Sequence, residues 1–301
     1  MRKLRTKISK NIILYLFLLP MLIYIIIFNY APLYGLQIAF RNFNASKGIL
    51  GSEWVGFDHF QRFFSSPLFM NLLKNTLTLS IYQLVCTFPI PIILALILNY
   101  LPNQKLKKLT QTATYAPYFI SVVVLVGMLM VFFDPTTGIG TQILTRLGIE
   151  NAQVLLKPSA FRHLYVWSGV WQTTGWSSII YIATLSGVSP ELHEAAIVDG
   201  ANKIQRVIHV DLPVLIPTAI ILLILSCGNV MNLGFEKVFL MQTAPNLTTS
   251  EVISTYVYKI GLQGQQYSYS SAIGLFNNVI NFVILISVNQ FAKKASDNSL
   301  W

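Results

Sequence analysis

Charged residues are scarce in this chain. In one short segment, Ser189–Pro213, they stand in a regular sequence pattern. Glu191 suits the positive end of a helix that Ser189 caps, and Gly200 suits the C-terminal end of that helix. A second short helix is predicted over Lys203–His209. Such a segment can be a plain connector between larger elements. Its regular helix–glycine–helix pattern also offers ordered, charged helices for contact with a partner.

The sequence contains no combination of residues that is typical of a catalytic site. The two cysteines, Cys86 and Cys227, lie in apolar stretches and are interpreted as packing residues. No glycine-rich phosphate loop is present. The histidines are scattered without metal-ligand spacing: His59, His163, His193 and His209. The sequence therefore predicts no catalytic or metal site, and no site of its own for ATP.

The elements that carry these residues are predicted from charge and hydropathy. Of the 301 residues, 54% are apolar and 11% are charged, which is too few charges for the surface of a soluble globule. Six stretches of 24 residues or more lack any charged residue or histidine: Asn11–Phe40, Asn75–Gln104, Leu109–Phe133, Leu164–Pro190, Leu212–Phe235 and Ile260–Ala292. Each is long enough to cross a bilayer as a helix, which takes about 20 residues. A soluble enzyme, a secreted disulfide scaffold and a nucleic-acid binder are excluded, despite the net charge of +10.

Orientation follows from where the basic residues lie relative to these stretches. Lysine and arginine are concentrated next to the span ends that lie on the same side of the membrane as the N-terminus. This distribution predicts that both termini are inside the cell. The outer segments, about residues 41–74, 134–163 and 236–259, are longer. The first is rich in aromatic residues and is expected to form short amphipathic helices in the membrane interface, with Trp54, Phe57, Phe60, Phe63 and Phe64.

The segment between the fourth and fifth stretches carries a longer pattern. Glu194-Ala195-Ala196, three residues, Gly200, nine residues and then Val210-x-Leu212-Pro213 resembles the EAA loop of binding-protein-dependent ABC importer permeases. Val210 departs from the usual isoleucine by one methylene. Asp199 suits the sugar-permease branch of that family. The run Gly228–Met241 and the terminal Ser299-Leu300-Trp301 are similar to the lipoprotein-dependent oligosaccharide permeases, on less specific motifs.

The resemblance implies an all-α protein of the bacterial plasma membrane. Residues 1–301 would form a single permease domain. Its six spans are expected at about 11–36, 71–99, 110–133, 164–188, 213–235 and 270–292, with a cytoplasmic two-helix coupling loop over 189–212. It implies a transport subunit that is not itself an enzyme and works with a second permease, as a heterodimer. Two cytoplasmic ATPases would bind the ATP and Mg²⁺, and an extracellular solute-binding lipoprotein would deliver an oligosaccharide. The loop residues implied to contact the ATPase are Glu191, Glu194, Ala195, Ala196, Asp199 and Gly200.

Polar residues inside the spans are the candidates for a substrate path, because such residues should face a cavity or another helix. Amide and aromatic side chains suit a sugar, but helix–helix packing explains any single one of them equally well. The candidates are Trp171, Gln172, Trp176, Tyr181, Asn229, Asn232 and Glu236. Glu236 stands beside Lys237 and is interpreted either as a gate or as half of an ion pair.

Other functions fit the sequence less well. One alternative is a secondary transporter or a channel. Ion-coupled carriers often place acidic residues within their spans, and these six stretches have none, which argues against proton coupling. An intramembrane enzyme would need a catalytic constellation, which the sequence lacks. A permease for a non-sugar solute, such as a peptide or phosphate, is compatible with the loop, and only the sugar-like flanking pattern argues against it.

Overall fold

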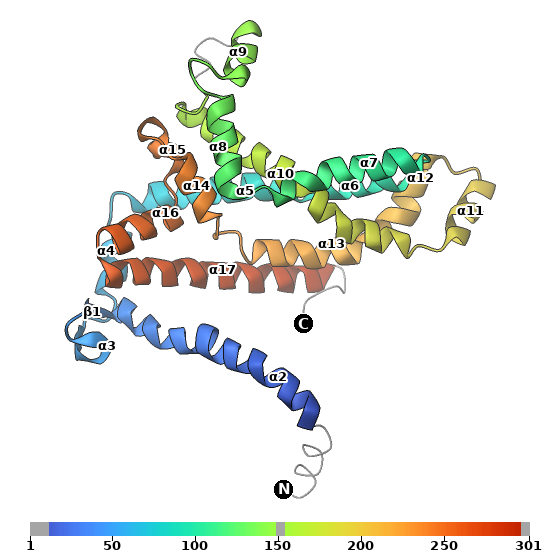
Figure 1. The fold of residues 1–301 in the computed structure, drawn as a ribbon. Coiled ribbons are helices and arrows are strands. Elements are labelled where there is room, and N and C mark those ends of the chain that lie inside the picture. The colour runs from blue at the N-terminus through green and yellow to red at the C-terminus, as the bar shows by residue number, and fades with distance from the viewer. Residues whose placement is uncertain (1–11, 149–153, 296–301) are drawn as a thin grey trace, which may run out of the picture. The chain divides into compact units, whose positions relative to one another are not determined.

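The computed structural model describes residues 12–148 and 154–295. Within these ranges the chain is a series of helices joined by short segments, with one two-stranded hairpin (Figure 1). The first half comprises α2 (Ile12–Ile25), β1 (Arg41–Asn44), α3 (Gly48–Gly51), β2 (Ser52–Trp54), α4 (Asp58–Phe64), α5 (Phe69–Thr87), α6 (Pro89–Asn99), α7 (Gln104–Tyr115), α8 (Val122–Phe132) and α9 (Ile139–Arg146). The second half comprises α10 (Pro158–Ser186), α11 (Pro190–Val198), α12 (Lys203–Arg206), α13 (Leu212–Cys227), α14 (Phe235–Met241), α15 (Leu247–Ser250), α16 (Ile253–Tyr258) and α17 (Tyr267–Ala295).

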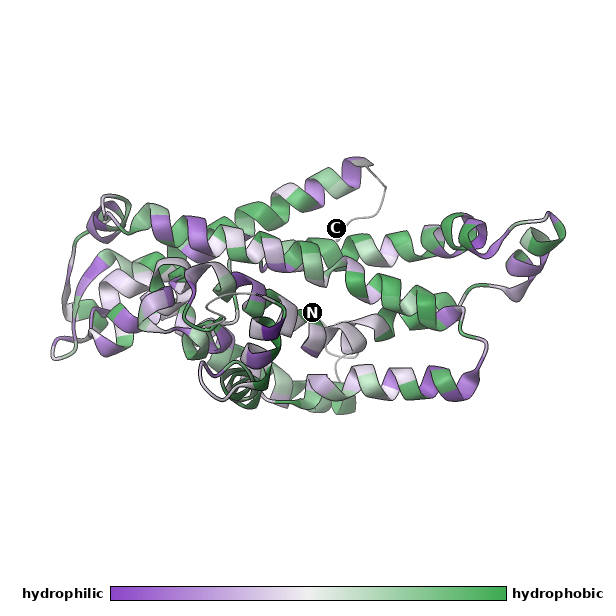
Figure 2. Cartoon of the chain, turned by 90° about the horizontal axis from the view of Figure 1, so that it is seen from above, coloured by the Kyte–Doolittle hydropathy of each residue, from purple (hydrophilic) through white to green (hydrophobic). Residues whose placement is uncertain are grey.

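Four described helical segments are long and apolar enough to cross a membrane. They are Ile12–Phe40, Phe69–Asn99, Lys203–Cys227 and Tyr267–Lys294, and a bent pair, Gln104–Phe119 with Val122–Phe132, makes a fifth if it counts as one span. Apolar residues dominate these long helices, and hydrophilic residues gather at helix ends and connections (Figure 2). The apolar, charge-free stretches thus form helices of the length that a bilayer requires.

The chain divides into two compact units. The smaller comprises Met1–Ser66 and Val257–Phe276. Its β1 and β2 pair antiparallel, and Phe40 stacks on Trp54 with ring centroids 5.7 Å apart. Ser268 accepts a hydrogen bond from the Phe43 amide at 2.8 Å, which ties the hairpin to the start of α17.

The expectation of short helices in residues 41–74 holds for α4 but is wrong for the hairpin. Trp54 belongs to β2, and Phe57 precedes the short helix α4, which holds Phe60, Phe63 and Phe64. Gly56, with φ of +60°, takes a left-handed conformation between strand and helix that favours glycine. The aromatic spacing alone did not reveal this turn.

The larger unit comprises Pro67–Tyr256 and Asn277–Trp301, and α10 runs through its centre. This helix packs against α5, α6, α7 and α13. Its buried Phe161, Tyr165 and Val166 meet Leu79 and Val238 in one core cluster. Further along, Tyr181 and Leu185 pack with Ala95 and Leu215. The buried side of α10 therefore packs against other helices, while other residues along it are exposed.

The stretch expected as one span over 110–133 is not a continuous helix. Helix α7 continues into the 3₁₀ helix Ala116–Phe119, and α8 starts at Val122 at an angle of 99° to the preceding segment. Ser121 caps α8 through a hydrogen bond from the Val124 amide, 3.3 Å long. Pro117 lies buried at the bend, and a cap and a proline together favour a helix break there.

The stretch expected as a span over 213–235 also differs. The predicted second loop helix does not stop at His209: α12, the π-helical segment Val207–Asp211 and α13 form one helix from Lys203 to Cys227. Asn202 begins this helix with a capping box to Gln205, a signal that the prediction overlooked. Residues 228–234 are turn and irregular structure before α14 begins at Phe235.

Candidate functional site

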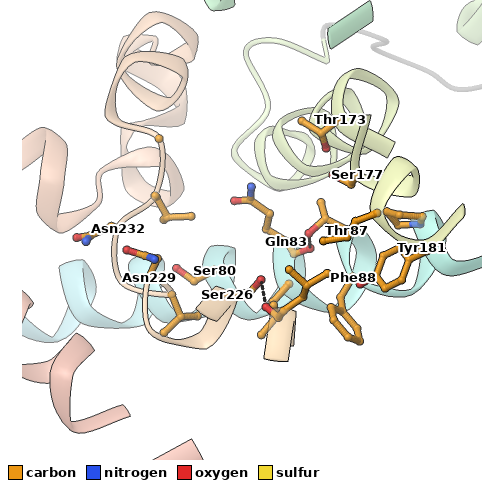
Figure 3. A pocket seen from close by; sticks show the side chains of 17 residues that line it. Ser80, Gln83, Thr87, Phe88, Thr173, Ser177, Tyr181, Ser226, Asn229 and Asn232 are labelled. Carbon is orange, nitrogen blue, oxygen red and sulfur yellow. Dashed lines mark hydrogen bonds between the residues drawn. The ribbon is translucent and has the colours of Figure 1, made fainter. Parts of the chain in front are cut away.

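A cavity of about 450 Å³ opens inside the larger unit. Its walls are α5, the start of α6, the middle of α10, the end of α13 and the irregular residues that follow α13 (Figure 3). Helix α5 ends at Thr87, and Phe88 alone separates it from α6, which begins at Pro89. Both Thr87 and Phe88 border the cavity. The irregular backbone after α13 therefore lies where it lines a cavity rather than facing lipid, as a membrane requires.

The lining of this cavity is polar but uncharged. Its hydroxyl and amide side chains are Ser80, Gln83, Thr87, Thr173, Ser177, Tyr181, Ser226, Asn229 and Asn232. The buried Ser80 hydroxyl has no hydrogen-bond partner among the described residues, and the Gln83 amide extends into the open space in Figure 3. Groups of this kind, set among apolar walls, can both donate to and accept from a ligand rich in hydroxyls.

Three of the predicted substrate-path residues lie at this cavity: Tyr181, Asn229 and Asn232. Tyr181 is buried on α10. The Asn229 amide donates to the Leu225 carbonyl at 3.3 Å, and Asn232 Oδ1 accepts from Asn277 Nδ2 at 2.9 Å. The contact with Asn277 ties the cavity wall to α17.

The structure places the remaining candidates elsewhere. Gln172 points away from the cavity and donates to the Ile120 carbonyl at 2.7 Å, at the bend between α7 and α8. Trp176 stacks on Tyr118 with ring centroids 4.5 Å apart. Trp171 borders a separate apolar hollow beside α8. Gln172 and Trp176 thus contact the segment between α7 and α8, and none of the three side chains lines the cavity.

Glu236 and Lys237 do not form an ion pair. Glu236 is exposed in the first turn of α14, whereas Lys237 is buried and donates to the Tyr165 carbonyl at 2.8 Å. Its ammonium also lies 4.8 Å from the centre of the Tyr165 ring. Burial lowers the pKa of Lys237 to about 8. Lys237 is thus a link between α14 and α10.

Sequence reasoning missed six polar residues of the cavity, although their spacing was informative. On α5, Ser80, Gln83 and Thr87 recur at helical spacing. On α10, Thr173 and Ser177 lie four residues apart and share a face with Tyr181. Sorting the polar residues by helix face would have selected them, together with Ser226, ahead of the tryptophans.

The segment between α10 and α13 presents an exposed helix. Gly200 follows α11 with φ of +81°, and Ala201 donates to the Ala196 carbonyl at 2.8 Å, as in a Schellman motif. Ser189 precedes α11, but its hydroxyl makes no capping hydrogen bond, contrary to expectation. None of the α11 residues is buried. The predicted contact residues lie here, all exposed except the half-buried Ala196: Glu191, Glu194, Ala195, Ala196, Asp199 and Gly200.

Comparison with protein families assigns this architecture. Residues 87–297 match the family described as "Binding-protein-dependent transport system inner membrane component". The chain belongs to this family. The matched residues include the whole exposed α10–α13 segment and most of the cavity lining, so both features lie in the part that defines the family.

Relatives of this transport component cover the whole chain. The polygalacturonan/rhamnogalacturonan transport system permease protein YteP of Bacillus subtilis is 40% identical over 300 residues, which is 100% of this chain and 94% of YteP. Protein LplB of the same organism is 41% identical over 96% of this chain and 91% of its own length. The chain is thus a membrane component of a transport system.

Solved structures give the same result for the fold. A chain of a bacterial ABC transporter involved in the import of the acidic polysaccharide alginate superposes with a TM-score of 0.91 at 37% identity, covering 98% of this chain and 99% of the other. The alginate transporter in complex with its alginate pentasaccharide-bound periplasmic protein gives a TM-score of 0.90 over the same shares of both chains. The described helices therefore have the arrangement of an ABC importer's membrane subunit.

Proposed function

We propose that this chain is the permease subunit of an ATP-driven importer for an oligosaccharide. The observation that carries the proposal is the uncharged cavity, whose hydroxyl and amide side chains come from α5, α10 and the α13 end. Membership in a binding-protein-dependent transport family supports import. The names of YteP and of the alginate transporter support a sugar as the cargo.

The proposed topology has six spans, with both termini on the cytoplasmic side of a bacterial plasma membrane. The four long apolar segments and the bent α7–α8 pair would supply five spans. Helix α10, 29 residues long and packed against α5, α6, α7 and α13, would supply the sixth. The side of a span that faces other helices can carry polar residues at little cost, because lipid does not touch it.

The proposed complex contains a second permease, two cytoplasmic ATPases that hold ATP and Mg²⁺, and an extracellular binding lipoprotein. The exposed α11 would dock on an ATPase. Its Leu192, Ile197 and Val198 are 53%, 54% and 86% exposed, which leaves apolar side chains free for such a contact. Ala195 and Gly200 permit close approach, and Glu194 would supply a charge.

The experiment that tests this function is ATP hydrolysis by the reconstituted complex with and without sugar-loaded binding protein. Loaded binding protein is expected to stimulate hydrolysis. Glu194→Ala should reduce the stimulated rate at least about tenfold, because losing one partner of an interfacial charge pair costs about 2 kcal/mol or more. Glu53→Ala, which removes an exposed glutamate from β2, is the matched control and should have no effect. An ATP hydrolysis rate that does not change when sugar-loaded binding protein is added would contradict the proposal.

A cavity variant tests the sugar path separately. Gln83→Ala is expected to raise the sugar concentration needed for half-maximal transport about tenfold, since a hydrogen bond to a neutral partner contributes about 1 kcal/mol and a buried unpaired group costs more. The maximal rate of ATP hydrolysis should not change. Gln111→Ala, on α7 and outside the cavity lining, is the control. Transport of labelled sugar into proteoliposomes is measured for both variants and the wild type. Equal half-saturating sugar concentrations in the three proteins would show that Gln83 does not contact the sugar.

A further inference from the structure

A buried carboxylate lies where the exposed segment becomes the α13 helix. Asp211 is fully buried, with an exposed fraction of 0%. Its Oδ2 accepts a hydrogen bond from the Tyr100 hydroxyl at 2.6 Å. Tyr100 directly follows α6, so this bond joins the end of α6 to the start of α13.

The other oxygen of the same carboxylate faces α11. Asp211 Oδ1 lies 3.4 Å from His193 Nε2, and it has no hydrogen-bond partner among the described residues. The contact is an ion pair when the imidazole is protonated. The His193 ring also meets the Tyr100 ring edge-on, with centroids 6.2 Å apart. One carboxylate thus contacts side chains from two other elements.

Arg206, at the end of α12, is the fourth side chain of this group. Its guanidinium carbon lies 5.5 Å from the centre of the Tyr100 ring, a cation–π distance. Burial, together with the hydrogen bond to Asp211, raises the pKa of Tyr100 to about 12, so its hydroxyl keeps its proton and remains a donor. We name the four side chains, Tyr100, His193, Arg206 and Asp211, the Asp211 cluster.

The cluster is costly to form and therefore costly to break. A buried carboxylate loses its hydration, and hydrogen bonds from inside the protein must replace it. Separating the end of α6 from α13 would leave the Asp211 charge buried without its hydrogen-bond donor, and moving α11 away would remove the His193 contact. One side chain at the start of α13 thus contacts side chains beside α6 and on α11.

We propose that Asp211 is a positioning residue that makes α6 follow the coupling helix α11 when the ATPases close. The proposal rests on the proposed function. Helix continuity from α12 into α13 carries motion to one wall of the cavity. The Asp211–Tyr100 bond carries it to a second wall, because α6 continues from α5, where Gln83 and Thr87 line the cavity.

The first test measures motion in the assembled complex. Ile97 on α6 and Ile216 on α13 are 55% and 47% exposed and receive spin labels, after Cys86 and Cys227 are replaced with alanine. The label distance is measured by electron paramagnetic resonance without nucleotide and with a non-hydrolysable ATP analogue. With the cluster intact, both states should give the same distance. In the Tyr100→Phe background the distance should change on nucleotide binding.

The second test measures the ATP hydrolysed per sugar imported. Tyr100→Phe keeps the ring and removes only the hydroxyl, and it should raise this ratio about tenfold, as expected for losing a hydrogen bond to a charged group. Asp211→Asn should raise the ratio similarly, and the double variant should be no worse than either single one, since all three lack the same link. Tyr115→Phe is the control, because its hydroxyl bonds to no other described residue.

The outcomes separate the two proposals. A wild-type distance that changes with nucleotide as much as the Tyr100→Phe distance does would overturn the role of Asp211. A wild-type ATP-to-sugar ratio in Tyr100→Phe and Asp211→Asn would overturn it as well. A wild-type complex that binds no ATPase or imports no sugar would instead overturn the proposed function, before any variant is compared.

Discussion

Replacing Gly175 with alanine is expected to prevent α10 and α7 from packing. A β-carbon on Gly175 would overlap the carbonyl oxygen and carbon of Thr114 and would also lie 2.9 Å from the Tyr115 amide nitrogen. These are backbone atoms, which cannot rotate away as the end of a side chain can. The helices would have to separate, and overpacking a well-packed contact typically costs about 1–3 kcal/mol, more when backbone must move.

The substitution would destabilise the whole larger unit, because α10 also packs against α5, α6 and α13. We expect the Gly175→Ala protein to melt well below the wild type or to be lost during purification. Gly127→Ala is the matched control, since Gly127 lies in the α8 part of the bent pair and a β-carbon there would have no neighbour within 4 Å among the described residues. Thermal unfolding in detergent, followed by size-exclusion fluorescence, measures both. Equal melting of Gly175→Ala and wild type would contradict the close approach of α7 and α10.

The helices of this protein could be predicted from the sequence because a bilayer imposes their length and excludes charge from them. The α2, α5–α6, α13 and α17 regions all fall within or across charge-free stretches. The bend between α7 and α8 could not be predicted in the same way. Pro117 and the Ser121 cap favour the break locally, and the Gln172 amide donates to the Ile120 carbonyl there, but hydropathy carries no information about any of these contacts.

The same distinction holds for the candidate site. The end of α11 at Gly200 follows from local chemistry, and the structure has it there. The cavity depends on which face of each helix turns inward. Tyr181, Asn229 and Asn232 were selected by polarity alone, which equally selected Trp176, a residue that stacks on Tyr118 instead. The Asp211 cluster joins residues up to 111 positions apart, so no local pattern indicates it.

Replacing Gly200 with valine is expected to uncouple ATP hydrolysis from transport. Gly200 has φ of +81°, and a β-branched residue is strongly disfavoured in that conformation. No described atom lies within 4 Å of the position a methyl group would take, so the cost arises from the backbone and not from a clash. A left-handed residue costs at least about 1–2 kcal/mol. The chain would relieve this by changing the turn that ends α11.

That change would reach the docking surface, because the Gly200 and Ala201 amides hold the Ile197 and Ala196 carbonyls in place. We expect sugar transport to fall about thirtyfold or more, as a change of about 2 kcal/mol implies, while assembly and basal hydrolysis persist. Gly200→Asn should retain transport, since asparagine tolerates this conformation. Gly148→Val imposes the same strain after α9, where φ is +82° and no described atom lies within 4 Å, and it should leave transport intact. Should Gly148→Val and Gly200→Val reduce transport equally, general destabilisation rather than the turn after α11 would explain the loss.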